Sequence, residues 1–130
     1  MKRTDLLKGS IAVWTGISLF HTAIAAEPAL DRAQLQRQLP GNTIRYEGAG
    51  EVIHEYLAPD GTIHGQSSVH GRYSAHWRLH ENDLICFEHD DPMQSGCVAV
   101  VLRGSQIEYH RRDGVIEGPF QFIPGNPEKL

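Results

Sequence analysis

The hydrophobic positions along the chain fall into three patterns. An unbroken apolar run covers residues 11–20. Three leucines then recur at near-helical spacing, which predicts a short helix over residues 27–39, with Pro28 in its first turn and Pro40-Gly41 after its end. Beyond that point no stretch keeps a helical period. Short alternating runs separated by turn residues take over, and this pattern predicts antiparallel β-strands.

The alternating runs indicate seven or eight strands. They cover residues 43–47, 51–57, 62–67, 69–79, 84–88, 97–103, 106–111 and 115–123. The longest run, 69–79, places Val69, Tyr73 and Trp77 on one face and the histidines on the other. Pro119 interrupts the last run, so we expect an edge strand or a bent strand there.

The order of these elements predicts an all-β domain built as an antiparallel meander. Tight turns such as Pro59-Asp60-Gly61 join the strands, and no helix lies between them, which excludes a parallel β-α-β architecture. A closed barrel, a strongly curved sheet and a small sandwich remain. We favour a closed or strongly curved, lipocalin-like barrel, because closure removes exposed strand edges. The short N-terminal helix is expected across one end or beside it.

The first apolar run belongs to a predicted signal peptide. Lys2, Arg3 and Lys8 precede the run, and Ala23-Ile24-Ala25 follows it, as in secretory signal peptides. The run is shorter than the roughly 20 residues that span a bilayer. We therefore expect a signal peptide over residues 1–25 and a single β-rich domain over residues 26–130. The domain is expected in the periplasm or outside the cell, without stable membrane insertion after cleavage.

The expected mature domain is small and acidic. Its 105 residues are enough for one hydrophobic core and too few for two. The whole chain carries a formal charge of -4, to which the predicted signal peptide contributes +2, so the domain carries -6. An acidic surface repels phosphate backbones, and this argues against a nucleic-acid partner.

Two cysteines fall in the exported part of the chain. Thiols oxidise in that environment, and Cys86 and Cys97 allow one pairing. They lack the Cys-x-x-Cys spacing of redox-active pairs. We expect a structural disulfide worth about 2 to 3 kcal/mol, given the short loop that it closes.

Several turn and core residues occur in one order along the chain. They are Leu39-Pro40-Gly41-Asn42-Thr43-Ile44, Tyr56-Leu57-Ala58-Pro59-Asp60-Gly61-Thr62, Gly65, Trp77-Arg78, Cys86-Phe87, Gly96-Cys97 and Gly125-Asn126-Pro127-Glu128-Lys129-Leu130. In this frame the chain resembles a group of small exported proteins common in alphaproteobacteria. The resemblance covers essentially the whole domain and implies a secreted, disulfide-bridged, single-domain β protein. The group has no established biochemical activity, so the resemblance implies no catalytic residue.

Histidine is the unusual part of the composition, and imidazole is a common ligand of zinc and copper. The candidates for a metal site are His54, His64, His89, Asp90 and Asp91. If Ala58 pairs with Thr62 across the hairpin, His54 and His64 lie on the same face of the sheet. In the other registers they lie on opposite faces. The loop 88–91 supplies too few oxygens for calcium, and we expect a solvated hairpin tip there. We expect scattered histidines, with metal binding as the alternative.

No complete catalytic or cofactor motif is present in the sequence. Gly48-Ala49-Gly50 lacks the third glycine and the following helix of a dinucleotide-binding turn. Tyr73, Trp77 and Phe87 either fill the barrel or line a small-ligand cavity. We therefore expect no cofactor and a non-enzymatic barrel that binds an apolar small molecule or an envelope protein.

Three other functions stay open at this point. They are zinc or copper binding through histidines, inhibition of an envelope or extracellular enzyme, and catalysis by a histidine and carboxylate pair. Catalysis requires at least two ionisable side chains that converge in a pocket and share a hydrogen bond.

Overall fold

The structure is a computed structural model, and it describes residues 27–130. The predicted signal peptide over residues 1–25 and the expected start of the domain at residue 26 lie outside the described residues. Among those that are described, no helix has the length and apolar character needed to cross a membrane.

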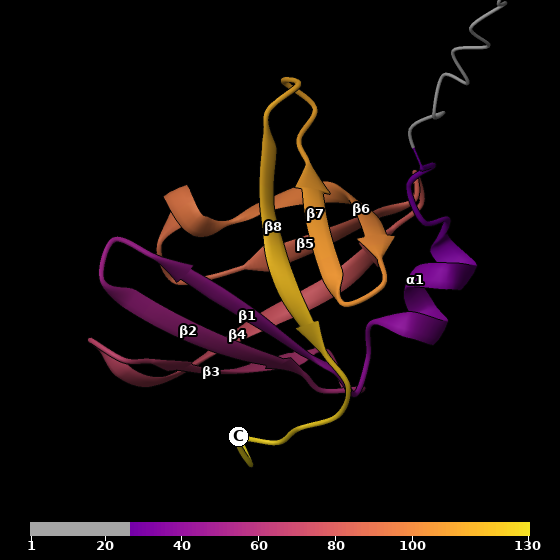
Figure 1. Ribbon diagram of the computed structural model, residues 1–130. Helices are drawn as coiled ribbons and strands as arrows, with labels where there is room; N and C mark the ends of the chain where they lie inside the picture. Colours follow the sequence, from indigo (N-terminus) through magenta and orange to yellow (C-terminus); the bar gives the residue numbers. More distant parts are fainter. Residues whose placement is uncertain (1–26) are drawn as a thin grey trace, which may run out of the picture.

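Eight antiparallel strands form a closed barrel in which neighbours in the chain are neighbours in space (Figure 1). The strands are β1 (Thr43–Gly48), β2 (Glu51–Leu57), β3 (Thr62–Ser67), β4 (Gly71–His80), β5 (Leu84–Glu88), β6 (Gly96–Arg103), β7 (Gln106–His110) and β8 (Ile116–Ile123). β8 closes the barrel by pairing with β1, where Thr43 lies opposite Ile123. The predicted all-β meander is thus confirmed, and of the three architectures considered the chain adopts the closed barrel.

The N-terminal helix α1 (Arg32–Gln38) is shorter than predicted. Asp31 begins it with a capping box, in which the Asp31 side chain accepts a hydrogen bond from the Gln34 backbone and the Gln34 side chain accepts one from the Asp31 backbone. Pro28 therefore precedes the helix and does not lie in its first turn. Leu35 and Leu39 are fully buried in the hydrophobic core at the end of the barrel where β1 begins, called the helix end below.

The predicted long strand over residues 69–79 begins two residues late. Val69 lies in the turn before β4 and is 62% exposed, so its placement on one strand face with Tyr73 and Trp77 was wrong. The Ser67 hydroxyl accepts hydrogen bonds from the backbone N–H groups of Val69 and His70 and holds these residues in a turn.

The strand that carries Pro119 is not an edge strand, because β8 pairs with both β7 and β1. Proline is accommodated since the β1 ladder stops at Gln121 and the β7 ladder shifts register between Ile107 and Tyr109, so neither requires an N–H group from Pro119. Gly118 has a φ of 105° at this irregularity, and a Cβ there would lie 3.0 Å from the Ile107 carbonyl oxygen.

The C-terminal residues 124–130 form no strand but are fixed to the start of β1. The Asn42 side chain accepts a hydrogen bond from the Gly125 N–H, and the Thr43 hydroxyl donates one to the Gly125 carbonyl. The two Gly-Asn segments at opposite ends of the domain therefore lie next to each other.

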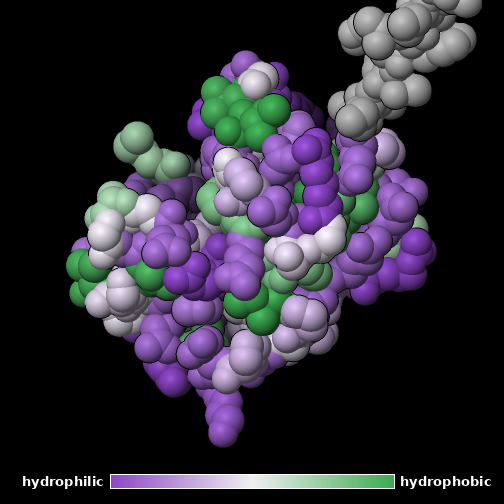
Figure 2. Space-filling model, in the orientation of Figure 1, coloured by the Kyte–Doolittle hydropathy of each residue, from purple (hydrophilic) through white to green (hydrophobic). Residues whose placement is uncertain are grey.

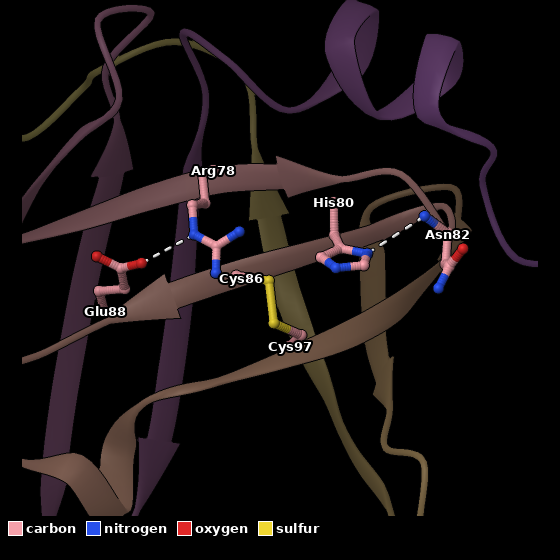
Figure 3. The surroundings of a disulfide bond; sticks show 6 residues. All are labelled: Arg78, His80, Asn82, Cys86, Glu88 and Cys97. Atoms are coloured by element: carbon pink, nitrogen blue, oxygen red, sulfur yellow. Dashed lines mark hydrogen bonds and ion pairs between the residues drawn. A yellow bond between two sulfur atoms is a disulfide. The ribbon is translucent and has the colours of Figure 1, made fainter.

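A disulfide joins Cys86 of β5 to Cys97 of β6, as predicted. The two cysteines are directly paired across the strands, on the face of β5 opposite to Phe87. Figure 3 shows them near Arg78 and Glu88, whose side chains form an ion pair at 2.9 Å. This outer face is thus separate from the barrel interior.

Candidate functional site

A pocket of about 720 Å³ opens at the end of the barrel away from α1. The hairpins and loops over residues 48–51, 67–71, 88–96 and 110–116 surround this end, called the open end below. The inner faces of the strands contribute to the pocket four aromatic rings, those of Tyr46, Tyr73, Phe87 and Tyr109, and the buried carboxylate of Glu55. The more exposed carboxylate of Glu117 on β8 also lines it, opposite Tyr109. The helix end is packed with aliphatic side chains, so the interior is hollow at one end only.

Two of the three aromatic residues proposed from the sequence line this pocket. Tyr73 and Phe87 do so, whereas Trp77 is not among the lining residues. Trp77 is 8% exposed and donates a hydrogen bond from its indole nitrogen to the Ala58 carbonyl at 2.9 Å. Its side chain belongs to the packed core and not to the pocket.

Glu55 is the carboxylate inside the barrel. It has the same orientation on β2 as Ile53 and Leu57, and its side chain is 7% exposed. The Tyr73 hydroxyl donates a hydrogen bond to Glu55 Oε1 at 2.5 Å. Among the described residues no donor is hydrogen-bonded to Oε2. One oxygen of a buried carboxylate in the pocket is therefore without a protein partner in this part of the chain.

His89 follows β5 and turns into the same pocket. Its Nε2 lies 3.7 Å from Glu55 Oε1, and its ring centroid lies 6.1 Å from that of Tyr73. The Ser95 hydroxyl accepts a hydrogen bond from the His89 backbone, which fixes the start of the loop. Glu55 and His89 therefore converge as the enzyme hypothesis requires, but at a separation longer than a hydrogen bond.

The reach of Tyr73 toward Glu55 depends on the residue between them. Glu55 lies opposite Gly65 on β3, and Gly65 lies opposite Tyr73 on β4. A Cβ at Gly65 would overlap the Tyr73 ring. Because this position has no side chain, the ring lies across β3 and its hydroxyl meets the carboxylate on β2.

Two further tyrosines form the opposite wall. The hydroxyls of Tyr46 and Tyr109 are 2.6 Å apart, and both rings contact Phe120, with centroid distances of 4.6 and 5.2 Å. Burial raises the pKa of both hydroxyls well above the usual value, and the negative charge of Glu55 adds to this rise. These groups stay protonated at neutral pH.

The Tyr73 hydroxyl is also protonated at neutral pH. Burial is the main cause that raises the pKa of its hydroxyl, and the neighbouring Glu55 carboxylate is the next. The hydroxyl therefore acts as a neutral donor to Glu55 and does not neutralise its charge.

The rim of the pocket carries two arginines and two carboxylates, of which Arg112 is exposed and in no ion pair within residues 27–130. Arg111 contacts Asp113 at 2.7 Å and Glu117 at 3.4 Å, and all three side chains are substantially exposed. Such ion pairs are screened by solvent. The charge deep in the pocket is thus that of Glu55.

The candidate metal ligands lie in different places. Tyr56 pairs with His64, so the register is the one that puts His54 and His64 on a single, outer face. His54 contacts Glu128 at 3.8 Å, and His89 lies inside the barrel. Asp90 is exposed, and Asp91 accepts a hydrogen bond from the Met93 backbone. Within residues 27–130 no group of three or more His, Cys, Asp or Glu side chains is placed to hold a metal ion.

Sequence reasoning missed Glu55, Tyr46 and Tyr109. In the segment 51–57 either alternate set of residues contains apolar side chains, so the inward set was ambiguous. One signal could have identified Glu55. Residues two apart on a strand point to the same face, so Glu55 shares a face with the apolar residues Ile53 and Leu57, and apolar residues mark the inner face.

Comparisons with protein-family models, with curated proteins and with solved structures find no match to this chain.

Proposed function

We propose that this chain is an exported, non-enzymatic binding protein that holds a small organic molecule in the open end of its barrel. The observation that carries the proposal is the pocket of about 720 Å³ lined by four aromatic rings. Ligand pockets have volumes of roughly 300 to 1,000 Å³ and combine apolar walls with a few polar groups. A rigid barrel supplies such walls without the need to reorganise on binding.

The setting of the protein supports a role outside the cytoplasm. The first 25 residues have the layout of a signal peptide, and the domain contains a disulfide between Cys86 and Cys97. We place the protein in the periplasm or in the secreted fraction, as the resemblance to small exported alphaproteobacterial proteins also implies.

A filled pocket tests the proposal. Gly96 lines the pocket, and a Cβ at this position would contact nothing within 4 Å, so Gly96→Phe adds a ring to the cavity without a backbone clash. Gly48 also has open space around it but does not line the pocket, so Gly48→Phe is the matched control.

Binding of the neutral probe ethylindole would be followed by NMR titration. We expect saturable binding to the wild type and to Gly48→Phe, and weakening by about tenfold or more in Gly96→Phe. Equal binding to Gly96→Phe would overturn the proposal, as would a wild type that binds neither ethylindole nor its charged analogues tryptamine and indolepropionate.

A second candidate function is suggested by the apolar tips around the open end. Val69, Met93, Val115 and Ile116 are all exposed there. Figure 2 shows the tip of the β7–β8 hairpin as a hydrophobic patch on a largely hydrophilic face. Exposed apolar residues gathered at one end are typical of protein contact sites, and a partner bound there would make the chain an interaction module or an inhibitor of that partner. Crosslinking in intact cells with a photoreactive residue at Met93 tests this; the absence of any crosslinked protein would count against it.

A further inference from the structure

The charge of Glu55 lacks a strong counterpart in the described part of the protein. A buried carboxylate is costly unless a cation or several hydrogen bonds compensate it. Tyr73 supplies one neutral hydrogen bond, and His89 lies 3.7 Å away. Arg111, at the rim of the pocket, is paired with Asp113 and Glu117. None of the ion pairs within residues 27–130 joins Glu55 to an arginine or a lysine.

The surroundings of the carboxylate suit a cation with an organic body. Tyr46, Tyr73, Phe87 and Tyr109 line the pocket together with Glu55. The face of an aromatic ring is negative and attracts cations, most strongly where water is excluded. Oε2 of Glu55, which accepts no hydrogen bond from the described residues, is available to a donor in the pocket.

We infer that the pocket recognises an organic cation, a molecule with an apolar or aromatic body and a protonated amine that contacts Glu55. The inference rests on the proposed function and specifies the chemical class of its ligand. An anionic ligand would be repelled by Glu55, and a neutral ligand would leave its charge compensated by the Tyr73 hydrogen bond alone. A bare metal ion would find no three ligands placed together within residues 27–130 and would leave most of the pocket of about 720 Å³ unfilled.

Three probes that share one ring system test the inference on the wild-type protein. Tryptamine carries a protonated amine, ethylindole is neutral, and indolepropionate is an anion. We expect tryptamine to bind about 10- to 100-fold more tightly than ethylindole, and indolepropionate to bind most weakly. If ethylindole binds and tryptamine binds no more tightly, the cation inference is wrong and the proposed function stands. If none of the three binds, both are wrong.

A substitution at the carboxylate tests the residue assignment. Glu55→Gln removes the charge but keeps an oxygen that can accept the Tyr73 hydrogen bond. We expect it to lower tryptamine affinity by about 10- to 100-fold and to leave ethylindole affinity unchanged. Equal losses for both probes would show that the pocket shape, and not the charge, had been altered.

The matched control is Glu88→Gln. Glu88 lies on β5 next to His89, but its side chain is on the outer face, where it pairs with Arg78 (Figure 3). The substitution removes the same charge from the same region, and we expect both probes to bind as they do to the wild type. A loss of tryptamine affinity as large as that of Glu55→Gln would mean that net charge alone attracts the cation, which would overturn the assignment to Glu55.

Discussion

Tyr73 and Gly65 form a directly opposed cross-strand pair inside the barrel, and the tyrosine ring occupies the space that a side chain at Gly65 would need. The absence of a side chain at Gly65 thus determines where the Tyr73 hydroxyl lies in the pocket. It lets a residue of β4 donate a hydrogen bond to Glu55 on β2, across the strand between them.

Gly65→Ala is expected to displace the Tyr73 ring and to break its hydrogen bond to Glu55. Overpacking of this kind costs about 1 to 3 kcal/mol of unfolding free energy, measured by chemical denaturation. Gly48→Ala, with nothing within 4 Å of its added Cβ, should change the unfolding free energy much less. If the two variants are equally stable, the contact between Gly65 and Tyr73 does not constrain the pocket.

Ionisation of the buried tyrosines predicts a loss of stability at high pH. The raised pKa values of Tyr46, Tyr73 and Tyr109 mean that the folded state holds these phenolic protons more tightly than the unfolded state. The contribution of these protonated tyrosines to the free energy of unfolding is fully present below the unfolded pKa of about 10. It is lost as the pH rises above that value toward the folded pKa. Each such tyrosine costs about 1.4 kcal/mol per pH unit there. Tyrosinate absorbance should show that these three of the four tyrosines ionise only as the protein unfolds.

Tyr46→Phe separates this effect from general alkaline denaturation. The variant loses the hydrogen bond to the Tyr109 hydroxyl and should be about 1 kcal/mol less stable at neutral pH. Above pH 10 or so its stability should fall less steeply than that of the wild type, because it has one less buried group to ionise. Parallel curves for the two proteins would contradict the argument.

The disulfide is expected to support the fold without determining it. The bridge closes a sequence separation of 11 residues, for which loss of chain entropy gives about 2 to 3 kcal/mol. The double variant Cys86→Ser and Cys97→Ser should therefore unfold at lower denaturant concentration but still bind ethylindole, since Cys97 borders the pocket while its bond to Cys86 lies on the face of β5 opposite to Phe87. A double variant that folds but no longer binds would show that the disulfide shapes the pocket.

The architecture was accessible from the sequence because it depends on local signals. Turns such as Pro59-Asp60-Gly61 and the alternation within β4 are readable from neighbouring residues, and a meander pairs each strand with the next. The site depends on contacts between strands. Gly65 matters because it lies between Glu55 on β2 and Tyr73 on β4. These two partners are known only once the register of both hairpins is known.

The same limit explains the error at Val69 and why the sequence left an edge strand open as one of two alternatives at Pro119. Val69 continues the alternation of β4, but hydrogen bonds from its backbone and that of His70 to the Ser67 hydroxyl draw it into a turn. Pro119 by itself is compatible with an edge strand or a bent strand, and the register shift opposite it accommodates proline in a strand that has partners on both sides. In both places a tertiary arrangement overrides the local pattern.

Glu55 should be a residue that the fold does not need. Buried charged groups are often replaced by neutral ones at no cost, because the desolvation of the charge is no longer required. Glu55→Gln, which keeps an acceptor for Tyr73, is therefore expected to unfold with a free energy equal to or up to about 1 kcal/mol above that of the wild type.

Thr43 provides the contrast, since it is also a buried polar residue but its hydrogen bond joins two segments of the fold that are far apart in the sequence. Its hydroxyl donates to the Gly125 carbonyl and fixes the C-terminal segment, so Thr43→Val should destabilise the fold by about 1 to 3 kcal/mol. Denaturation of both variants beside the wild type decides the matter. A Glu55→Gln variant as unstable as Thr43→Val would mean that the carboxylate is retained for folding. A stable variant that has lost tryptamine affinity would mean that the charge is retained for binding, at the expense of stability.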